Sequence, residues 1–327
     1  MERILKDKRV LVTGGAGFIG SNLVESFLLS ENTVVCLDNF STGKRENLKS
    51  FSDNPKFILI EGDIRNYDDC LKAVENIDIV FHQAALGSVP RSIKDPVSST
   101  DVNIGGFVKM LFAAKESGVK RFIYAASSST YGDHPDLPKV EDKIGTALSP
   151  YAITKYVDEL FAANFAKTYS IDVIGLRYFN VFGRRQDPDG DYAAVIPKFM
   201  KTLMKHEVPL INGDGSVSRD FTYIDNVVQV NHLAAVVQNN AALNQVYNVA
   251  FGEKTSLNEL YFFIRNLAAE FDKNILTIEP AYGPDRAGDI RHSLASIQKA
   301  KKLLYYSPKF SVEEGLKEAV KWYWKNL

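Results

Sequence analysis

A tyrosine and a lysine four residues apart, Tyr151 and Lys155, are of the types and spacing that acid–base chemistry requires. Ser149 can cap a helix and Pro150 suits its first position, so both side chains would share one helical face. The apolar residues that follow keep helical spacing: Tyr156, Leu160, Ala163 and Ala166. A neighbouring positive charge favours phenolate and lowers the tyrosine pKa from about 10. The pair is therefore suited to act as a base that takes a proton from an alcohol.

Tyr-x-x-x-Lys is by itself a weak pattern in a chain with 15 tyrosines. A second copy runs from Tyr305 to Lys309, but Pro308 would break the helix that must align that pair. The catalytic interpretation of Tyr151 therefore depends on the elements that surround it.

A glycine-rich segment follows the first predicted strand, 10–13, and precedes a helical pattern at 21–29. The glycines can be read as Gly14-x-x-Gly17-x-x-Gly20 or as Gly15-x-Gly17-x-x-Gly20. A strand, a glycine turn and a helix form the setting in which backbone N–H groups bind a pyrophosphate. The alternative is a tight turn with no ligand.

The next predicted strand, 33–37, ends at Asp38 and favours the ligand-binding interpretation. An acidic residue at this place accepts hydrogen bonds from the adenosine ribose and repels a 2′-phosphate. The sequence therefore predicts NAD rather than NADP as the cofactor.

Strands continue to alternate with helices along the chain. Further strands are expected at 57–60, 77–82, 121–126 and 172–177, and helices near 67–74, 101–117 and from 150 onward. This order predicts an α/β fold with a doubly wound parallel sheet (Rossmann fold), whose ligands lie beyond the carboxyl ends of the strands. Polar residues fall at such ends: Asp38, Asp63, His82 and Ser127.

Glycines, prolines and polar turns become more frequent after about residue 178. We expect residues 1–177 to form the NAD-binding domain, with 226–250 returning to it. Residues 178–225 and 251–327 would then form a smaller mixed α/β substrate domain. A capping box at Ser311 and Glu314 predicts a final amphipathic helix.

Composition narrows the class of protein. The chain has 327 residues, 45% hydrophobic and 24% charged, as is ordinary for a globular protein. A net charge of −1 supplies no basic field, so we expect neither nucleic acid nor a membrane as partner. Only two cysteines, Cys36 and Cys70, and a charged N-terminus indicate a cytoplasmic protein. We expect no metal.

Taken together, the motifs resemble the extended short-chain dehydrogenases/reductases over nearly the whole chain. The segments that carry the resemblance are 13–20, 37–39, 62–63, 82–85, 127–132, Tyr151 with Lys155, 177–183 and 219–225. Segments 82–92 and 193–199 are most similar to the bacterial UDP-N-acetylglucosamine 4-epimerases of that family.

The resemblance implies roles for the acid–base residues. Tyr151 would remove the proton of the sugar 4-hydroxyl, Lys155 would lower its pKa and hold the nicotinamide ribose, and Ser127 would bond the reacting oxygen. NAD would take hydride from C4 and return it to the opposite face of a transient 4-keto sugar. The implied cofactor contacts are Gly14, Gly17, Phe18, Ile19, Gly20, Asp38, Asn39, Asp63, Ile64, Gln83, Ala84, Ala85, Asn103, Tyr151, Lys155 and Tyr178.

The resemblance also implies contacts with a UDP-sugar. These are Gly87, Ser88, Ser127, Ser128, Tyr151, Asn180, Ala194, Val195, Arg219, Arg286, Asp289 and Ser293. The two arginines would face the diphosphate, and a capping or surface role stays open for Ser88 and Asn103. Ser293 would lie beside the C2 substituent, where relatives restricted to UDP-glucose carry Tyr. This predicts interconversion of UDP-GlcNAc and UDP-GalNAc, with UDP-Glc and UDP-Gal handled less well.

The same scaffold supports other functions, which differ in the residues they need. A 4,6-dehydratase has Asp and Glu after the catalytic hydroxyl, where this chain has Ser128 and Ser129. A UDP-glucuronate 4-epimerase, in which Arg91 would hold the carboxylate, stays open. A non-catalytic NAD-binding protein would not need the full set of Ser127, Tyr151 and Lys155.

The family further implies a homodimer through the helices near 101–117 and 150–168. The apolar residues expected there are Phe107, Leu111, Phe161 and Phe165.

Overall fold

The computed structural model describes residues 3–189, 194–284 and 291–327. Within them one parallel sheet of seven strands has the order β11-β6-β5-β4-β1-β2-β3. The strands are β1 Arg9–Thr13, β2 Thr33–Asp38, β3 Phe57–Glu61, β4 Ile79–His82, β5 Arg121–Ser127, β6 Asp172–Tyr178 and β11 Gln245–Val249. This architecture confirms the predicted doubly wound α/β fold.

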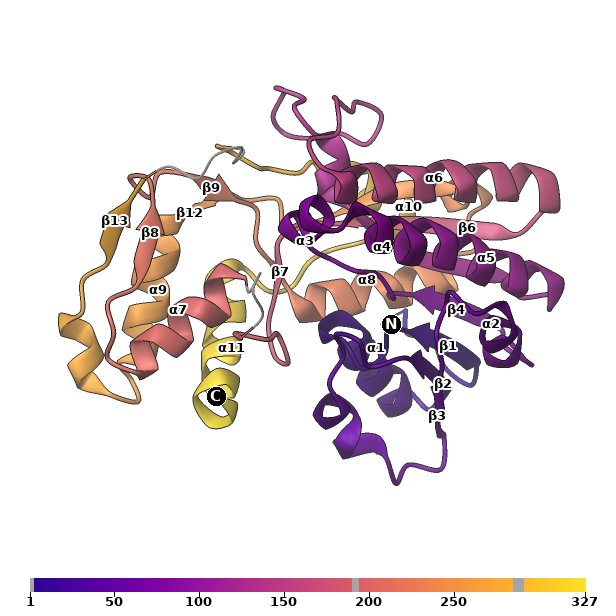
Figure 1. Cartoon of the computed structure of the whole chain (residues 1–327), viewed down its shortest axis with the longest axis horizontal. Coiled ribbons are helices and arrows are strands. Elements are labelled where there is room, and N and C mark those ends of the chain that lie inside the picture. The colour runs from indigo at the N-terminus through magenta and orange to yellow at the C-terminus, as the bar shows by residue number, and fades with distance from the viewer. Residues whose placement is uncertain (1–2, 190–193, 285–290) are drawn as a thin grey trace.

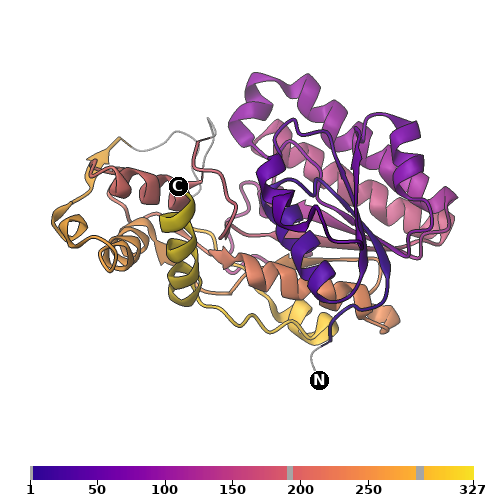
Figure 2. The same ribbon diagram turned by 90° about the horizontal axis from the view of Figure 1, so that it is seen from below.

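Helices cover both faces of the sheet (Figures 1 and 2). One face carries α1 (Phe18–Leu29), α8 (Ile224–Val236) and α10 (Gln298–Leu304). The other carries α2 (Tyr67–Ala73), α5 (Phe107–Glu116) and α6 (Pro150–Tyr169), with α3 (Val89–Lys94) and α4 (Pro96–Thr100) packed against α6. Alternate side chains of β1 enter separate cores, Val10 and Val12 on the α1 face and Leu11 on the α5 face. A strand buried on both faces explains the continuous apolar runs in the sequence.

The helix expected at 101–117 is less regular than predicted. A π-helical turn, η2 (Asp101–Gly106), connects α4 to α5. Such turns often mark functional sites. Gly106 lies in this turn, and a Cβ atom there would come within 2.5 Å of the Ile64 side chain.

Helix α6 has one face that is buried and another that is apolar but exposed. Leu160 is 52% exposed, whereas Ala152, Asp158, Ala162 and Phe165 point inward. The apolar spacing marked a second, outward face. Phe107, Leu111 and Phe165, expected on a partner-binding surface, are buried because they pack into the core between the sheet, α5 and α6.

A second lobe lies beside the carboxyl end of the sheet (Figure 1). Its helices α7 (Val195–Met204), α9 (Leu257–Ala268) and α11 (Val312–Asn326) pack on one another. Short strand pairs complete it: β7 (Val181–Phe182) with β10 (Thr222–Tyr223), β8 (Leu210–Asn212) with β13 (Ala281–Gly283), and β9 (Ser218–Arg219) with β12 (Thr255–Ser256). After β10 the chain leaves this lobe and forms α8 and then β11, which pairs with β6 of the main sheet. It then goes back to the second lobe.

Short-range sequence signals predicted correctly where α6 and α11 begin. Ser149 accepts a hydrogen bond from the N–H of Ala152 and Pro150 opens α6, as predicted. Ser311 and Glu314 form the capping box of α11. The remaining short helices are η1 (Arg45–Phe51), η3 (Ser128–Tyr131), η4 (Asn240–Ala242) and η5 (Lys273–Thr277). Among the described residues, no helix is long and apolar enough to span a bilayer.

Candidate active site

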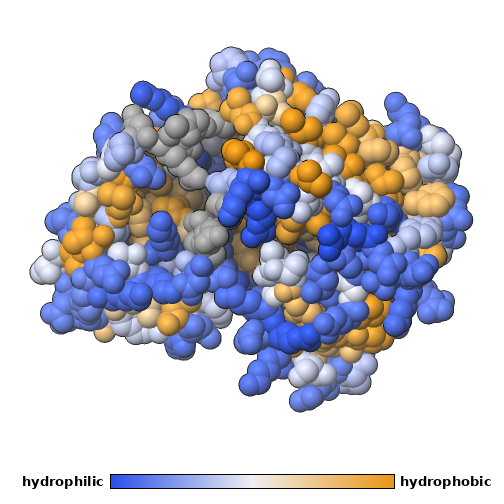
Figure 3. Space-filling model, in the orientation of Figure 1, coloured by the Kyte–Doolittle hydropathy of each residue, from blue (hydrophilic) through white to orange (hydrophobic). Residues whose placement is uncertain are grey.

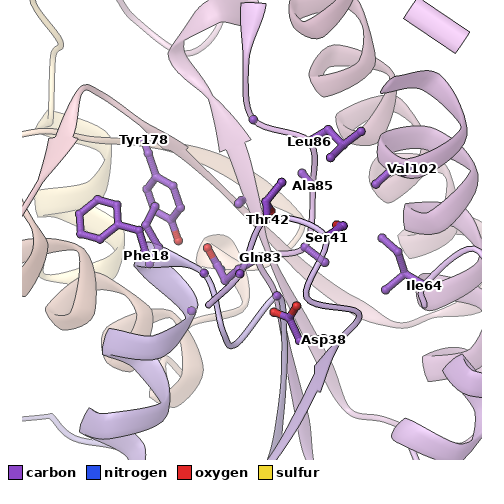
Figure 4. Close-up of a pocket in the computed structure, with 18 of the residues that line it drawn as sticks. Phe18, Asp38, Ser41, Thr42, Ile64, Gln83, Ala85, Leu86, Val102 and Tyr178 are labelled. Carbon is purple, nitrogen blue, oxygen red and sulfur yellow. The ribbon is translucent and has the colours of Figure 1, made fainter. Parts of the chain in front are cut away.

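A cavity of about 600 Å³ opens at the carboxyl end of the sheet. Figure 4 shows part of its lining, including the side chains of Phe18, Asp38, Gln83 and Tyr178. The predicted site residues that line it are Gly14, Gly17, Phe18, Ile19, Gly20, Asp38, Asn39, Asp63, Ile64, Gln83, Ala84, Ala85, Gly87, Ser127, Ser128, Tyr151, Lys155, Tyr178 and Asn180. The chain thus gathers residues from seven separate segments into one cavity.

The glycine turn between β1 and α1 forms one wall of this cavity. Gly14 has φ +66, a conformation that side chains disfavour, and a Cβ atom at Gly20 would lie 2.1 Å from the carbonyl oxygen of Gly14. Gly17 caps α1 without a side chain. The first-turn N–H groups of α1 are therefore presented to a ligand, as a pyrophosphate requires.

Asp38 lies at the end of β2 and is nearly buried. Its carboxylate oxygens accept hydrogen bonds from the N–H groups of Ala16 and Phe40, both at 2.8 Å. Burial raises the pKa of this carboxyl group above its usual value, against the effect of the two backbone bonds. Each oxygen keeps a further lone pair, so Asp38 can still accept from ribose hydroxyls.

Asp63 lies beside Asp38 at the next strand end. Its carboxylate accepts hydrogen bonds from the Asn39 amide at 2.8 Å and from the Arg65 guanidinium. Arg65 is the main reason that the pKa of Asp63 falls to about 2. Asp38 places a carboxylate where the adenosine ribose would bind, which suits NAD and disfavours a 2′-phosphate.

The acid–base residues meet at the other end of the cavity. Tyr151 and Lys155 project from the first turns of α6, and Ser127 ends β5. The Nζ atom of Lys155 donates to the carbonyl oxygen of Ala125 at 3.1 Å and to Asp158 at 3.2 Å. Lys155 is thereby held between α6 and β5, within the cavity wall.

The hydroxyl oxygen of Ser127 accepts two hydrogen bonds from Ser129. One comes from its backbone N–H at 3.2 Å and one from its hydroxyl at 2.9 Å. Because a hydroxyl oxygen has two lone pairs, the Ser127 proton is left to donate into the cavity. A hydroxyl so arranged can stabilise negative charge on a reacting oxygen.

Three predicted residues have other roles in the structure. Asn103 is buried behind the cavity, where its amide accepts from the N–H of Leu86 and donates to the Thr154 hydroxyl. Ser88 caps α3 by accepting from the N–H of Arg91, the alternative left open for it. His82 is buried and bonded to the Thr13 hydroxyl at 2.9 Å, and burial lowers its pKa to about 3. It supports the sheet and does not reach the cavity.

The other predicted substrate contacts lie on the second lobe. Ala194 and Val195 begin α7, and Arg219 lies on β9. Ser293 donates its backbone N–H to the carbonyl oxygen of Ser218 at 3.1 Å. Arg286 and Asp289 fall outside the described residues, so their predicted contacts stay predictions.

Sequence reasoning missed residues that act through the backbone or through another side chain. Ser41, Thr42 and Gly43 line the cavity after Asp38, and the small polar run following an acidic strand end was an available signal. Ser92 accepts the backbone N–H of Tyr151 at 3.0 Å. Nothing in a single sequence distinguishes this buried serine from others.

The fold and cavity define a Rossmann protein that binds a dinucleotide beside an acid–base group. Residues 10–250 match the family described as NAD dependent epimerase/dehydratase, and the chain belongs to that family. NAD is accordingly its cofactor, and the glycine turn, Asp38 and Lys155 fit that molecule.

Solved structures and curated relatives agree on the family. A UDP-N-acetylglucosamine 4-epimerase from Methanobrevibacter ruminantium M1, in complex with UDP-N-acetylmuramic acid, is 40% identical, with 99% of this chain and 100% of that chain covered and a TM-score of 0.91. A UDP-glucuronic acid 4-epimerase from Bacillus cereus, with UDP-glucuronic acid and NAD, is 31% identical, with 97% and 99% covered and a TM-score of 0.86. A UDP-glucose 4-epimerase of Mycolicibacterium smegmatis is 36% identical over 96% of this chain and 98% of its own.

Proposed function

We propose that the protein is a UDP-sugar 4-epimerase that interconverts UDP-GlcNAc and UDP-GalNAc. The observation that carries this proposal is that Ser127, Tyr151 and Lys155 line the same cavity as the glycine turn. Relatives described as 4-epimerases of three UDP-sugars support the reaction class.

The residues divide the work as follows. Tyr151 takes the proton of the sugar 4-hydroxyl, and Lys155 stabilises the phenolate that accepts it. Ser127 donates its proton in a hydrogen bond to the same oxygen as charge develops there. NAD, when bound, supplies the nicotinamide that accepts the hydride and later donates it back. Tyr151 then returns the proton after the 4-keto sugar has presented its other face.

The residues after Ser127 favour epimerisation over elimination of water. Ser128 lines the cavity and Ser129 is occupied in holding Ser127. Neither hydroxyl is an acid or base near neutral pH, so the site has no counterpart of the Asp and Glu that dehydration needs.

The preference for N-acetylated sugars is proposed from Ser293. This residue is bonded through its backbone N–H to Ser218 on the second lobe, and its side chain is smaller than the Tyr of relatives restricted to UDP-glucose. Arg91, the candidate partner of a glucuronate carboxylate, is not among the described residues that line the cavity. Ser293 is likewise not among the described lining residues, so the ranking of UDP-GlcNAc above UDP-glucuronate rests on the family resemblance at Ser293.

The test is product identity by NMR after separate incubation with UDP-GlcNAc, UDP-Glc and UDP-GlcA. We expect UDP-GalNAc to form fastest. If only UDP-GalA formed, the substrate would be UDP-GlcA and not UDP-GlcNAc, but the reaction would still be a 4-epimerisation. No product from any of the three sugars in NAD-loaded protein would contradict the reaction itself.

We also propose a homodimer in the cytoplasm. Large apolar side chains remain exposed on α3, α4 and α6, namely Ile93, Val97, Ile153, Leu160 and Phe161. Figure 3 shows apolar surface gathered over α4, α5 and α6. A contiguous patch of this kind suits an isologous contact between two copies. The cytoplasmic placement rests on Cys36 and Cys70, which are both free thiols.

A further inference from the structure

A buried carboxylate stands next to the acid–base residues and has no part in the proposed reaction. Asp158 lies one turn after Lys155 on α6 and is fully buried. Its Oδ2 atom accepts from the Nζ of Lys155 at 3.2 Å. Its Oδ1 atom has no hydrogen-bond partner among the described residues. A buried carboxylate with a single partner costs folding free energy, which indicates a role beyond packing.

Asp158 determines where the Lys155 ammonium can lie. An ammonium has three N–H donors, and two are directed to the carbonyl oxygen of Ala125 and to Asp158. The third donor is left for a ligand in the cavity, which Lys155 lines. The negative charge of Asp158 also opposes the positive charge by which Lys155 lowers the pKa of a neighbouring phenol.

The other charged groups around the pair are already neutral or matched. Glu159, next on α6, is bonded twice to Arg177 of β6, and Tyr131 of η3 lies against that arginine. Burial keeps His82 of β4 and Tyr124 of β5 uncharged by moving the pKa of each away from neutrality. Asp101 of η2 pairs with Arg65, and α4 (Pro96–Thr100) carries no titratable side chain. Lys155 is thus the main charge that Asp158 meets.

We propose that Asp158 is a positioning residue that anchors the Lys155 ammonium and offsets part of the positive charge that Lys155 presents beside Tyr151. The proposal deepens the assigned function and rests on Tyr151 as its base. Burial raises the pKa of Asp158 above its ordinary value, even though Lys155 acts against the rise. Asp158 therefore changes charge closer to neutral pH than an exposed aspartate, and its opposition to Lys155 weakens when it is protonated.

Two variants separate charge from position. Asp158→Asn keeps the size and an oxygen acceptor for Lys155 but removes the charge. We expect the acidic limb of the pH profile of kcat/KM to move down by about half to one pH unit. Asp158→Leu removes the acceptor as well, and we expect the same direction of shift with a lower kcat and little change in KM. Asp172→Asn, which alters a partly exposed carboxylate paired with Arg121, serves as the matched control and should shift nothing.

A direct titration makes the test independent of the substrate. Tyrosinate absorbance of the NAD-loaded protein is followed against pH by ultraviolet difference spectra, and the Tyr151→Phe protein is subtracted. The proposal expects Tyr151 to ionise at lower pH in either folded Asp158 variant. In the wild type it expects the Tyr151 curve to be broadened by a coupled second group.

Equal Tyr151 curves in the wild type, a folded Asp158 variant and the control would overturn the proposal. If neither variant folds, a simple one-site Tyr151 curve in the wild type overturns it on its own. Failure of the epimerase assignment would show instead as absent turnover with the titration shifts intact.

Discussion

Arg177 and Glu159 are joined by two parallel hydrogen bonds of 2.8 and 2.7 Å, with both side chains buried between α6 and β6. The guanidinium also donates to the carbonyl oxygen of Glu141 at 3.0 Å. This fork ties the helix that carries Tyr151 to β6, the strand next to the β11 edge of the sheet. The position of the base therefore depends on an ion pair outside the cavity.

Removing one partner of that pair should destabilise the protein strongly. Glu159→Ala leaves the Arg177 charge buried and unmatched, so we expect a loss of about 3–5 kcal/mol in the free energy of unfolding. Urea denaturation measures it. Glu116→Ala removes an exposed ion pair with Lys115 and should change little. Similar midpoints for the two variants would contradict the role of the fork.

Tyr151→Phe should abolish proton removal while the fold is kept. We expect turnover to fall about 10²–10⁴-fold, as loss of a general base commonly does. Tyr305→Phe is the matched control, because Tyr305 heads the second Tyr-x-x-x-Lys copy but follows the end of α10 and is exposed. Circular dichroism verifies both folds. Wild-type turnover in Tyr151→Phe would show that another group acts as the base.

NAD should stay bound through purification, since an epimerase must return the same hydride. Denaturing the protein should release NAD or NADH, and an assay of the supernatant should detect it. Gly20→Val should lower this content, because even a Cβ atom there collides with the carbonyl of Gly14. Activity that depends wholly on added NAD would count against retention.

Ser293→Tyr should narrow the substrate range. We expect kcat/KM to fall for UDP-GlcNAc and UDP-GalNAc and to be spared for UDP-Glc and UDP-Gal. The change corresponds to roughly 1–3 kcal/mol of discrimination. Ser296→Tyr, three residues further along the chain, controls for bulk in this segment. Equal losses of kcat/KM for both sugar pairs in Ser293→Tyr would show that Ser293 does not select for the N-acetyl group.

Leu160→Glu should convert a dimer into a monomer, because it places a charge on the exposed apolar face of α6. Light scattering at micromolar concentration measures the mass. Leu29→Glu, at an exposed position on α1 across the sheet, should leave the dimer intact. A monomeric wild type would exclude the assembly altogether.

Short-range signals in the sequence predicted most of the fold. The glycine turn, Asp38 at its strand end and the cap at Ser149 each depend on a few neighbouring residues, and each is where the pattern indicated. Phe107, Leu111 and Phe165 were expected on a partner-binding surface but are buried, because apolar spacing alone cannot distinguish a core from such a surface. The bond between Ser92 and Tyr151 and that between Asn103 and Leu86 join distant segments, so no local pattern announces them.

The return of the chain through α8 to β11 has an evolutionary consequence. A gene ending after β6 would encode a sheet whose outermost strand has lost its hydrogen-bonding neighbour and whose α1 face has lost α8. Such a fragment would expose an unpaired strand edge, which invites aggregation. A single crossover after β6 therefore cannot exchange the second lobe without also replacing α8 and β11.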